Sequence, residues 1–263
     1  MLSHPESSVM SIWLAESKER AYAEQLAQTL EMPIVEDEPA QDDYVLVCSA
    51  SGLALRGPTS TGIATLQMNY HLNPMWRRLQ QVRQKDALLR RAVRGQGKMP
   101  KRVFDATAGL CRDALSLAAL ECDVIAFEQS KLVLALVNDG LRRAATSLPA
   151  FAGLLQRLRL VHGDCLTAMS ADVAENGPPD VVFLDPMFPD RDQSASVKKE
   201  MALLHSFLRP PPSGDDLLRQ AYLTGASRVL VKRPKKAPAL APGVVHQFEG
   251  KSVRFDLYLN PSV

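Results

Sequence analysis

One segment near residue 185 constrains the fold of this chain more than any other. It reads Val181-Val-Phe-Leu-Asp-Pro-Met-Phe-Pro189, four apolar residues followed by a carboxylate, two prolines and an aromatic ring. The apolar residues predict a short buried strand. Proline fixes φ and cannot continue a sheet, so the chain must turn after Asp185. Asp185, Pro186 and Phe188 are therefore predicted at the carboxyl end of a strand, where open α/β sheets bind ligands.

This arrangement suits a planar base that carries an exocyclic amine. The amine can donate to the Asp185 carboxylate while the base stacks on the Phe188 ring. The alternative is a strand that ends in a proline-rich turn with no binding role.

A second strand, turn and helix follow one another between Arg102 and Leu120. Asp105 stands at the predicted strand end, Gly109 gives the turn its backbone freedom, and Asp113 opens an Ala/Leu-rich helix. The turn has one glycine, so the dinucleotide pattern G-x-G-x-x-G is absent, which argues against hydride transfer. Acids on both sides would repel phosphates but could receive an ammonium group.

Two further apolar segments also end in acids, namely Glu128 and Asp164. Alternating strands and helices predict a parallel sheet, which brings Asp105, Glu128, Asp164 and Asp185 to one edge. Glu128 lies about 20 residues beyond the glycine turn, where doubly wound folds place a carboxylate that binds ribose hydroxyls. For Glu128 alone, an ordinary solvated acid is the alternative.

Size and composition indicate a globular chain with one large core or one core plus an appendage. It has 263 residues, 46% of them hydrophobic. No apolar run is long enough to span a membrane and no leader precedes the chain, so a cytoplasmic location is the expectation. The five histidines are scattered and no C-x-x-C pair occurs, so we expect no metal site. Free thiols are expected at Cys48, Cys111, Cys122 and Cys165.

The net charge of +2 conceals an uneven distribution. Residues 16–43 are acidic, whereas residues 77–102, Lys198-Lys199 and Lys232-Arg-Pro-Lys-Lys236 are basic. Localised positive charge is typical of proteins that bind a phosphate backbone. For the run near residues 77–94, a solvated helix face is the alternative.

The first part of the chain predicts a small α+β unit over residues 1–72, and residues 73–263 predict the main domain with a basic lead-in helix. The expected elements of the small unit are a helix at Ser17–Leu30 and strands at Ile34-Val35, Tyr44–Cys48 and Leu53–Leu55. The further elements expected in the main domain are helices at Asp86–Val93, Lys131–Ala145 and Asp215–Leu223, the last capped or favoured by Asp215, and strands at Val229–Val231 and Ser252–Leu259, the last with Val253, Phe255, Leu257 and Leu259 on one face.

Four motifs in a fixed order carry a resemblance to a known family. They are Asp105–Asp113, Leu184–Pro189, Ser196–Met201 and Val229–Pro234. Together they resemble the RsmJ family of bacterial small-subunit ribosomal RNA guanine-N2 methyltransferases, over roughly residues 60–263. The resemblance implies a Rossmann-like, class I S-adenosylmethionine-dependent methyltransferase fold, with a seven-stranded sheet that ends in an antiparallel hairpin.

The resemblance also implies where the cofactor, S-adenosylmethionine, binds. The family's contacts fall on Arg112 and Asp113, Glu128 and Gln129, Asp164 and Cys165, and Asp185; Asp105 and Gly109 complete the predicted set. The chain departs from the family where Cys111 replaces a second glycine, where Gln129 replaces a frequent arginine, and where residues 76–94 lack the family's glycines.

The implied reaction is methylation of the exocyclic N2 of a guanine in 16S ribosomal RNA. Asp185, Pro186 and Phe188 would hold the base, and Lys198, Lys199, Lys232 and Arg233 would contact the RNA. The expected partner is 16S ribosomal RNA or the small ribosomal subunit. Two rivals remain, a methyltransferase for another amine (adenine N6 or a protein amide) and a non-catalytic RNA-binding relic of the fold.

Overall fold

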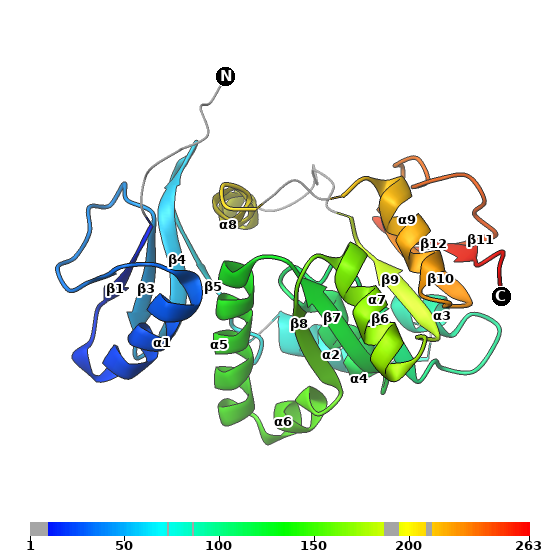
Figure 1. The fold of residues 1–263 in the computed structure, drawn as a ribbon, viewed down its shortest axis with the longest axis horizontal. Coiled ribbons are helices and arrows are strands. Elements are labelled where there is room, and N and C mark those ends of the chain that lie inside the picture. The colour runs from blue at the N-terminus through cyan, green and yellow to red at the C-terminus, as the bar shows by residue number, and fades with distance from the viewer. Residues whose placement is uncertain (1–9, 73, 86, 187–194, 209–211) are drawn as a thin grey trace. The chain divides into compact units, whose positions relative to one another are not determined.

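The computed structural model describes residues 10–72, 74–85, 87–186, 195–208 and 212–263. These residues form two compact units, each with its own sheet (Figure 1). The first unit holds residues up to Asn69, Ser130–Ala144 and the segment containing helix α8. The second holds Tyr70–Gln129 and the greater part of the chain after Ala145. Among the described residues, no helix has both the length and the apolarity needed to cross a membrane.

The first unit is built on a five-stranded sheet in the order β2-β1-β3-β4-β5. Strand β1 pairs in parallel with both β2 and β3, and β3, β4 and β5 form an antiparallel meander. The elements are β1 (Ser11–Leu14), η1 (Ser17–Glu19), α1 (Arg20–Leu30), β2 (Ile34–Val35), β3 (Val45–Ser49), β4 (Gly52–Thr59), β5 (Gly62–Gln67), most of α5 (Lys131–Ser147) and α8 (Ala195–His205).

The second unit is a seven-stranded sheet in the order β11-β12-β10-β9-β6-β7-β8. The five strands from β10 to β8 are parallel, while β12 is antiparallel to both β10 and β11. The elements are α2 (Met75–Val82), α3 (Leu88–Arg94), β6 (Arg102–Asp105), α4 (Arg112–Ala119), β7 (Asp123–Glu128), α6 (Pro149–Leu155), β8 (Leu158–His162), α7 (Cys165–Asn176), β9 (Val181–Leu184), α9 (Gly214–Leu223), β10 (Arg228–Pro234), β11 (His246–Glu249) and β12 (Val253–Leu259).

Helices cover both faces of this sheet. On one face, Met169 of α7 and Leu217 and Ala221 of α9 pack with Phe104 and Val182 of the central strands. On the other face, α4 packs across β6, β7 and β8. The central strand residues are buried on both sides, which explains why these strands read as continuous apolar runs. The chain order reverses between β6 and β9, the switch point at which such sheets bind ligands.

The predicted α/β fold, its seven strands and its antiparallel final hairpin are confirmed. The small α+β unit is also present, but it contains two strands that the sequence did not predict. They are β1, inside the sheet, and β5, at its edge. The helix expected at Asp86–Val93 runs over Leu88–Arg94, and it is preceded by α2, which was not predicted. All four cysteines are buried free thiols, as expected.

The division at residue 72 differs from the observed units, because α5 and α8 belong with the N-terminal strands. The reason is a buried carboxylate on α5. Asp139 accepts from the Leu53 backbone N at 2.9 Å and from Arg143 Nε at 2.7 Å. Arg143 in turn donates to the Met68 carbonyl and to Asn69. Such long-range polar bonds leave no trace in hydrophobic periodicity.

Two local predictions are corrected. The cap of α9 is Ser213 rather than Asp215, because the Ser213 hydroxyl accepts from the Asp216 backbone N at 3.1 Å. Asp215 lies in the first turn of the helix, where an acid is favourable, as the alternative prediction held. In β12 the alternating apolar residues do not mark the buried side. Arg254, Asp256 and Tyr258 are buried along with Phe255, whereas Leu259 is exposed. The buried polar pair in this strand defeats the assumption that alternating apolar residues mark the inner face.

We predict that Asp139→Ala destabilises the first unit. The change leaves the Arg143 guanidinium and a buried backbone N–H without their acceptor, which costs about 3 kcal/mol or more. Urea denaturation followed by tryptophan fluorescence measures the loss. Glu31→Gln, which removes the exposed ion pair with Lys131, is the control and should change stability by less than about 1 kcal/mol. Equal effects of the two changes would contradict the role of Asp139.

Candidate active site

Four acids follow the carboxyl ends of four parallel strands in the second unit. Asp105 and Glu128 are the last residues of β6 and β7, Asp164 comes two residues after β8, and Asp185 comes directly after β9. The parallel pairing of β8, β7, β6 and β9 brings these ends to one edge of the sheet. The edge predicted from the sequence is therefore present, and it includes the switch point.

The turn between β6 and α4 is fixed by backbone bonds and by one strand-end acid. The Gly109 N–H donates to Glu128 Oε2 at 3.0 Å, which ties the turn to the end of β7. Gly109 has a φ of +48° and Cys111, at the start of α4, a φ of +54°. Cys111 thus occupies a left-handed position that glycine adopts without strain.

Lys232 joins two acids beside the switch point. Its Nζ lies 2.7 Å from Asp113 Oδ2 on α4 and 2.7 Å from Asp185 Oδ2 after β9. Arg78 of α2 also bonds Asp113, at its other oxygen. Burial disfavours the charged form of Lys232, but the two carboxylates outweigh it and raise the pKa of the ammonium. Lys232 therefore stays charged and orients the Asp185 side chain.

Thr107 links Asp105 to Asp185. Its backbone N–H donates to Asp105 Oδ1 at 3.1 Å, and its Oγ1 accepts from the Asp185 backbone N at 2.6 Å. Asp105 is 1% exposed, and burial together with the nearby Asp113 raises its pKa to about 8. Near neutral pH the Asp105 carboxyl therefore holds a proton, which lowers the negative charge of the acid cluster.

The remaining predicted cofactor residues also lie along this edge. Asp164 caps α7 by accepting from the Leu166 backbone N at 3.0 Å, and Cys165 is buried behind it. The Gln129 carbonyl lies 3.1 Å from His162 Nε2. Arg112 is exposed at the first residue of α4.

The predicted base-holding residues are only partly described. Asp185 is half-buried and Pro186 is buried, whereas Phe188 lies outside the described residues. Lys198 and Lys199 lie on α8, which belongs to the first unit.

Two predicted RNA contacts turn inward. Lys232 is held by Asp113 and Asp185, so its role is in the acid cluster. Arg233 is 2% exposed, and its Nε and Nη2 donate to the Pro238 carbonyl. This burial argues against Arg233 as an RNA contact, because a phosphate needs an accessible guanidinium. The sequence predicted that the basic run Lys232–Lys236 forms one exposed surface. Its first two residues instead lie in β10 and point into the protein.

Sequence reasoning did not identify Arg78 or Thr107 as parts of the site. Arg78 lies on the helix that was not predicted, and its partner Asp113 is 35 residues away. Thr107 acts through a hydroxyl that accepts a backbone N–H from a residue 78 positions later. The ion pair of Lys232 had a detectable signal, because Lys232 directly follows an apolar strand predicted to end at the same edge.

Comparisons with known proteins agree with this geometry over nearly the whole chain. The family model described as "Putative SAM-dependent methyltransferase" matches residues 25–260. A curated protein from Pseudoalteromonas atlantica, named ribosomal RNA small subunit methyltransferase J, is 43% identical over 85% of this chain and 88% of its own length. One of the same name from Dechloromonas aromatica is 38% identical over 89% of this chain and 93% of its own length.

The chain belongs to this family of SAM-dependent methyltransferases. A solved SAM-dependent methyltransferase from Neisseria gonorrhoeae shares the fold, with a TM-score of 0.69 and 30% identity, and the match covers 97% of each chain. The match spans both compact units, so the N-terminal sheet is part of the family architecture. In a SAM-dependent methyltransferase, the acid-rich edge at the switch point is the expected cofactor site.

The chemistry of this edge fits S-adenosylmethionine. The cofactor carries a sulfonium, an ammonium and ribose hydroxyls, and all three are satisfied by carboxylate oxygens. Glu128 and Asp164 offer such oxygens, and Glu128 is already oriented by Gly109. The single-glycine turn, flanked by acids, does not suit a pyrophosphate, in agreement with the missing dinucleotide pattern.

The protonated state of Asp105 predicts a pH dependence of folding. The folded pKa is about 8 and the ordinary value is 3.8. Between these values the folded chain retains a proton that the unfolded chain releases, so stability is lost as pH rises through this window. Asp105→Asn should abolish this pH-dependent loss of stability. Its free energy of unfolding should therefore rise relative to that of the wild type by up to about 1.4 kcal/mol for each pH unit in this window. Urea denaturation at pH 5.5 and 8 measures the difference, with Asp123→Asn as an exposed control. A gap between Asp105→Asn and wild type that is equal at both pH values would contradict a neutral Asp105.

Proposed function

We propose that this methyltransferase modifies the exocyclic N2 of a guanine in 16S ribosomal RNA. The observation that carries the proposal is the carboxylate of Asp185, held by Lys232 where β9 ends in Asp-Pro, in a chain similar over most of its length to relatives named as small-subunit ribosomal RNA methyltransferases. The relatives' names favour an RNA base over a protein amide. The four motifs that resemble the guanine-N2 methyltransferases favour guanine over adenine N6. The four strand-end acids and the ordered ion pairs favour an enzyme over a non-catalytic relic.

The cofactor would lie along the edge from Asp105 to Asp185. Bound there, S-adenosylmethionine supplies an electrophilic methyl group on a sulfonium. We propose that Glu128 accepts from the ribose hydroxyls and that Asp164 and Cys165 lie beside the adenine. Gly109, Arg112 and Gln129 complete the lining, with the exposed Arg112 free to reach the amino-acid carboxylate.

We propose for the Asp113 carboxylate a different role from the one implied by the family resemblance. Both of its oxygens are engaged, one by Arg78 and the other by Lys232. We propose that Asp113 supports the site by holding Lys232 in place. A direct bond from Asp113 to the cofactor ammonium would have to share the carboxylate with these two cations.

Asp185 would act on the methyl acceptor. The N2 amine of guanine is a weak nucleophile because its lone pair is delocalised into the ring, so alignment supplies much of the catalysis. Asp185 would accept one N–H of this amine, with Pro186 and Phe188 fixing the base. Burial and the adjacent Asp113 raise the pKa of Asp185, although Lys232 opposes them. A carboxylate with a raised pKa is also a suitable acceptor for the proton that the methylated nitrogen releases.

The RNA would be bound by lysine side chains. Lys198 and Lys199 on α8 remain the proposed contacts of the first unit. The expected partner is the RNA itself or the small ribosomal subunit, and the place of action is the cytoplasm. Four buried free thiols fit a reducing compartment.

We predict that Glu128→Ala weakens S-adenosylmethionine binding. Removing the acceptor of the ribose hydroxyls and the partner of Gly109 should cost ~1–3 kcal/mol. Titration calorimetry measures the affinity, and Glu175→Ala at the far end of α7 is the control. If Glu128→Ala binds the cofactor as tightly as Glu175→Ala does, the ribose role of Glu128 is wrong.

The reaction itself predicts a labelling pattern. The purified protein and methyl-labelled cofactor should label small-subunit RNA from a strain lacking this gene, on N2 of a guanine. RNA from the parent strain should accept no label, because the position is already methylated. Asp185→Ala should lower turnover at saturating RNA by about a hundredfold, while the cofactor still binds. Labelling of adenine, or equal labelling of both RNAs, would favour the rival acceptors.

A further inference from the structure

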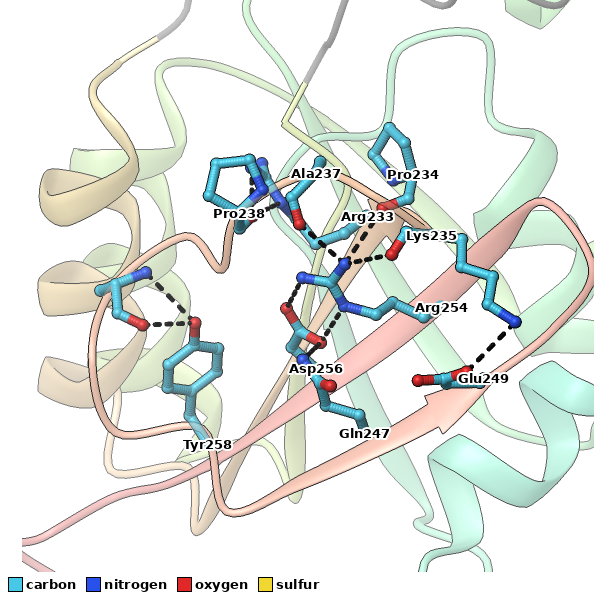
Figure 2. A network of polar contacts seen from close by, with 11 residues as sticks. Arg233, Pro234, Lys235, Ala237, Pro238, Gln247, Glu249, Arg254, Asp256 and Tyr258 are labelled. Atoms are coloured by element: carbon cyan, nitrogen blue, oxygen red, sulfur yellow. Dashed lines mark hydrogen bonds and ion pairs between the residues drawn. The ribbon is translucent and has the colours of Figure 1, made fainter.

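The loop that connects β10 to β11, residues 235–245, has little regular structure, yet side chains of the sheet hold its backbone (Figure 2). Arg254 of β12 donates through Nη1 to the carbonyls of Pro234 at 3.2 Å, Lys235 at 2.6 Å and Ala237 at 2.8 Å. We call this segment the β10–β11 loop. Its first turn therefore wraps around a single guanidinium group.

Two more side chains fix the rest of the loop. Arg233 donates to the Pro238 carbonyl at 3.0 and 2.7 Å. The Tyr258 hydroxyl donates to the Ala241 carbonyl at 2.9 Å and accepts from the Ala241 N–H at 3.2 Å. Figure 2 draws the side chains of Arg233, Arg254 and Tyr258 with their contacts to the loop backbone. Prolines at 234, 238 and 242 further limit its conformations.

The arginines that hold the loop break a general rule of sheet pairing. Arg233 and Arg254 lie directly opposite each other on β10 and β12, and both are buried. Like charges in such a position destabilise a sheet. Burial, with the charge of Arg254, lowers the pKa of Arg233. Asp256 offsets part of the cost through two bonds to Arg254, of 2.7 and 3.0 Å.

The Arg233 guanidinium, which is buried away from water, finds its acceptor in the Pro238 carbonyl of the loop. The fold thus retains an unfavourable pair of buried cations. The bonds of these two arginines define the backbone conformation of residues 234–238. A departure from local rules of this kind is typical of functional positions.

The loop begins at the edge that carries the candidate active site. Val231 pairs with Leu184 in the parallel β9–β10 ladder, so Lys232 is level with Asp185. Lys235 stands three residues further along the chain, about 10 Å beyond that level at the usual rise of a strand. Lys235 and Lys236 are both exposed. Lys235 makes one ion pair, with the half-exposed Glu249 at 3.2 Å, of a kind that contributes little in water.

We propose that the β10–β11 loop is a preformed docking surface for the phosphate backbone of the substrate RNA. Lys235 and Lys236 are its contacts, and Arg233, Arg254 and Tyr258 are positioning residues that set its shape. A loop ordered before binding loses less entropy when the RNA arrives, so two lysines can contribute more than they would on a mobile segment. The proposal rests on the proposed RNA substrate and adds where the RNA backbone is held.

The lysines are tested by removing their charge. Lys235→Gln with Lys236→Gln should weaken binding of small-subunit RNA at least about fivefold and reduce the slope of log K against log salt by about 1.4, since each phosphate contact on single-stranded RNA contributes about 0.7. Affinity for S-adenosylmethionine should not change. The control is Arg157→Gln with Arg219→Gln, which removes the same charge from exposed positions at the amino end of β8 and on α9. An equal loss of RNA binding in control and test variants would overturn the proposal in favour of diffuse attraction.

The positioning role is tested by a double-mutant cycle. Tyr258→Phe removes the bonds to Ala241, and Arg254→Lys keeps the charge while losing the forked contacts. Each should raise the KM for RNA severalfold at unchanged kcat and speed hydrogen exchange in residues 235–241. Each should have no further effect on KM in the Lys235→Gln, Lys236→Gln background. If the effect of Tyr258→Phe or Arg254→Lys on KM adds fully to the effect of the lysine changes, the loop shape does not act through the lysines.

The outcomes separate this inference from the proposed function. If the wild-type protein methylates RNA and the two lysine changes leave both KM and salt slope intact, the docking surface is wrong while the activity stands. If the wild type neither binds nor methylates small-subunit RNA, the proposed function fails first. If Arg254→Lys does not fold, Tyr258→Phe is the decisive variant, because the hydrogen bonds of the Tyr258 hydroxyl within the described residues go to the Ala241 backbone.

Discussion

The candidate site depends on the ammonium group of Lys232. Three acids meet where β6, β9 and α4 approach one another, namely Asp105, Asp113 and Asp185, and like charges at this density would separate the elements that carry them. Lys232 lies 2.7 Å from two of the three, Arg78 adds a second positive charge at Asp113, and burial keeps a proton on Asp105. The carboxylates offered to a cationic cofactor are thus the more accessible strand-end acids, Glu128 and Asp164.

The same strand serves a second purpose on its other face. Successive residues of a strand point to opposite sides of the sheet, so Lys232 reaches the acid cluster while Arg233 reaches the β10–β11 loop. One short basic sequence therefore orients the reacting carboxylate and shapes the loop that we propose binds RNA. The link is physical, because any shift of β10 along β9 would change both sets of contacts at once.

The N-terminal unit shows how a buried polar group can decide which segments share a unit. Asp139 lies within α5 but accepts from the backbone of β4, and Arg143 binds the end of β5. These bonds recruit part of a helix that follows β7 in sequence into the unit built on the first five strands. The family match covers both units.

The sequence alone determined the sheet and its acid-bearing edge. Buried parallel strands require continuous apolar runs and must turn where proline follows, so Val181–Leu184 was predicted at its observed bounds. A second apolar segment was predicted to end at Glu128, as β7 does. The family motifs fixed the methyltransferase fold and its cofactor. Only the tertiary structure decided the partners of the charged groups: Lys232 with two acids, Arg254 with Asp256 and the loop, and Asp139 with Leu53. Apolar burial repeats with the period of each element and is visible in the sequence, whereas a hydrogen bond between residues dozens of positions apart depends on where folding brings them.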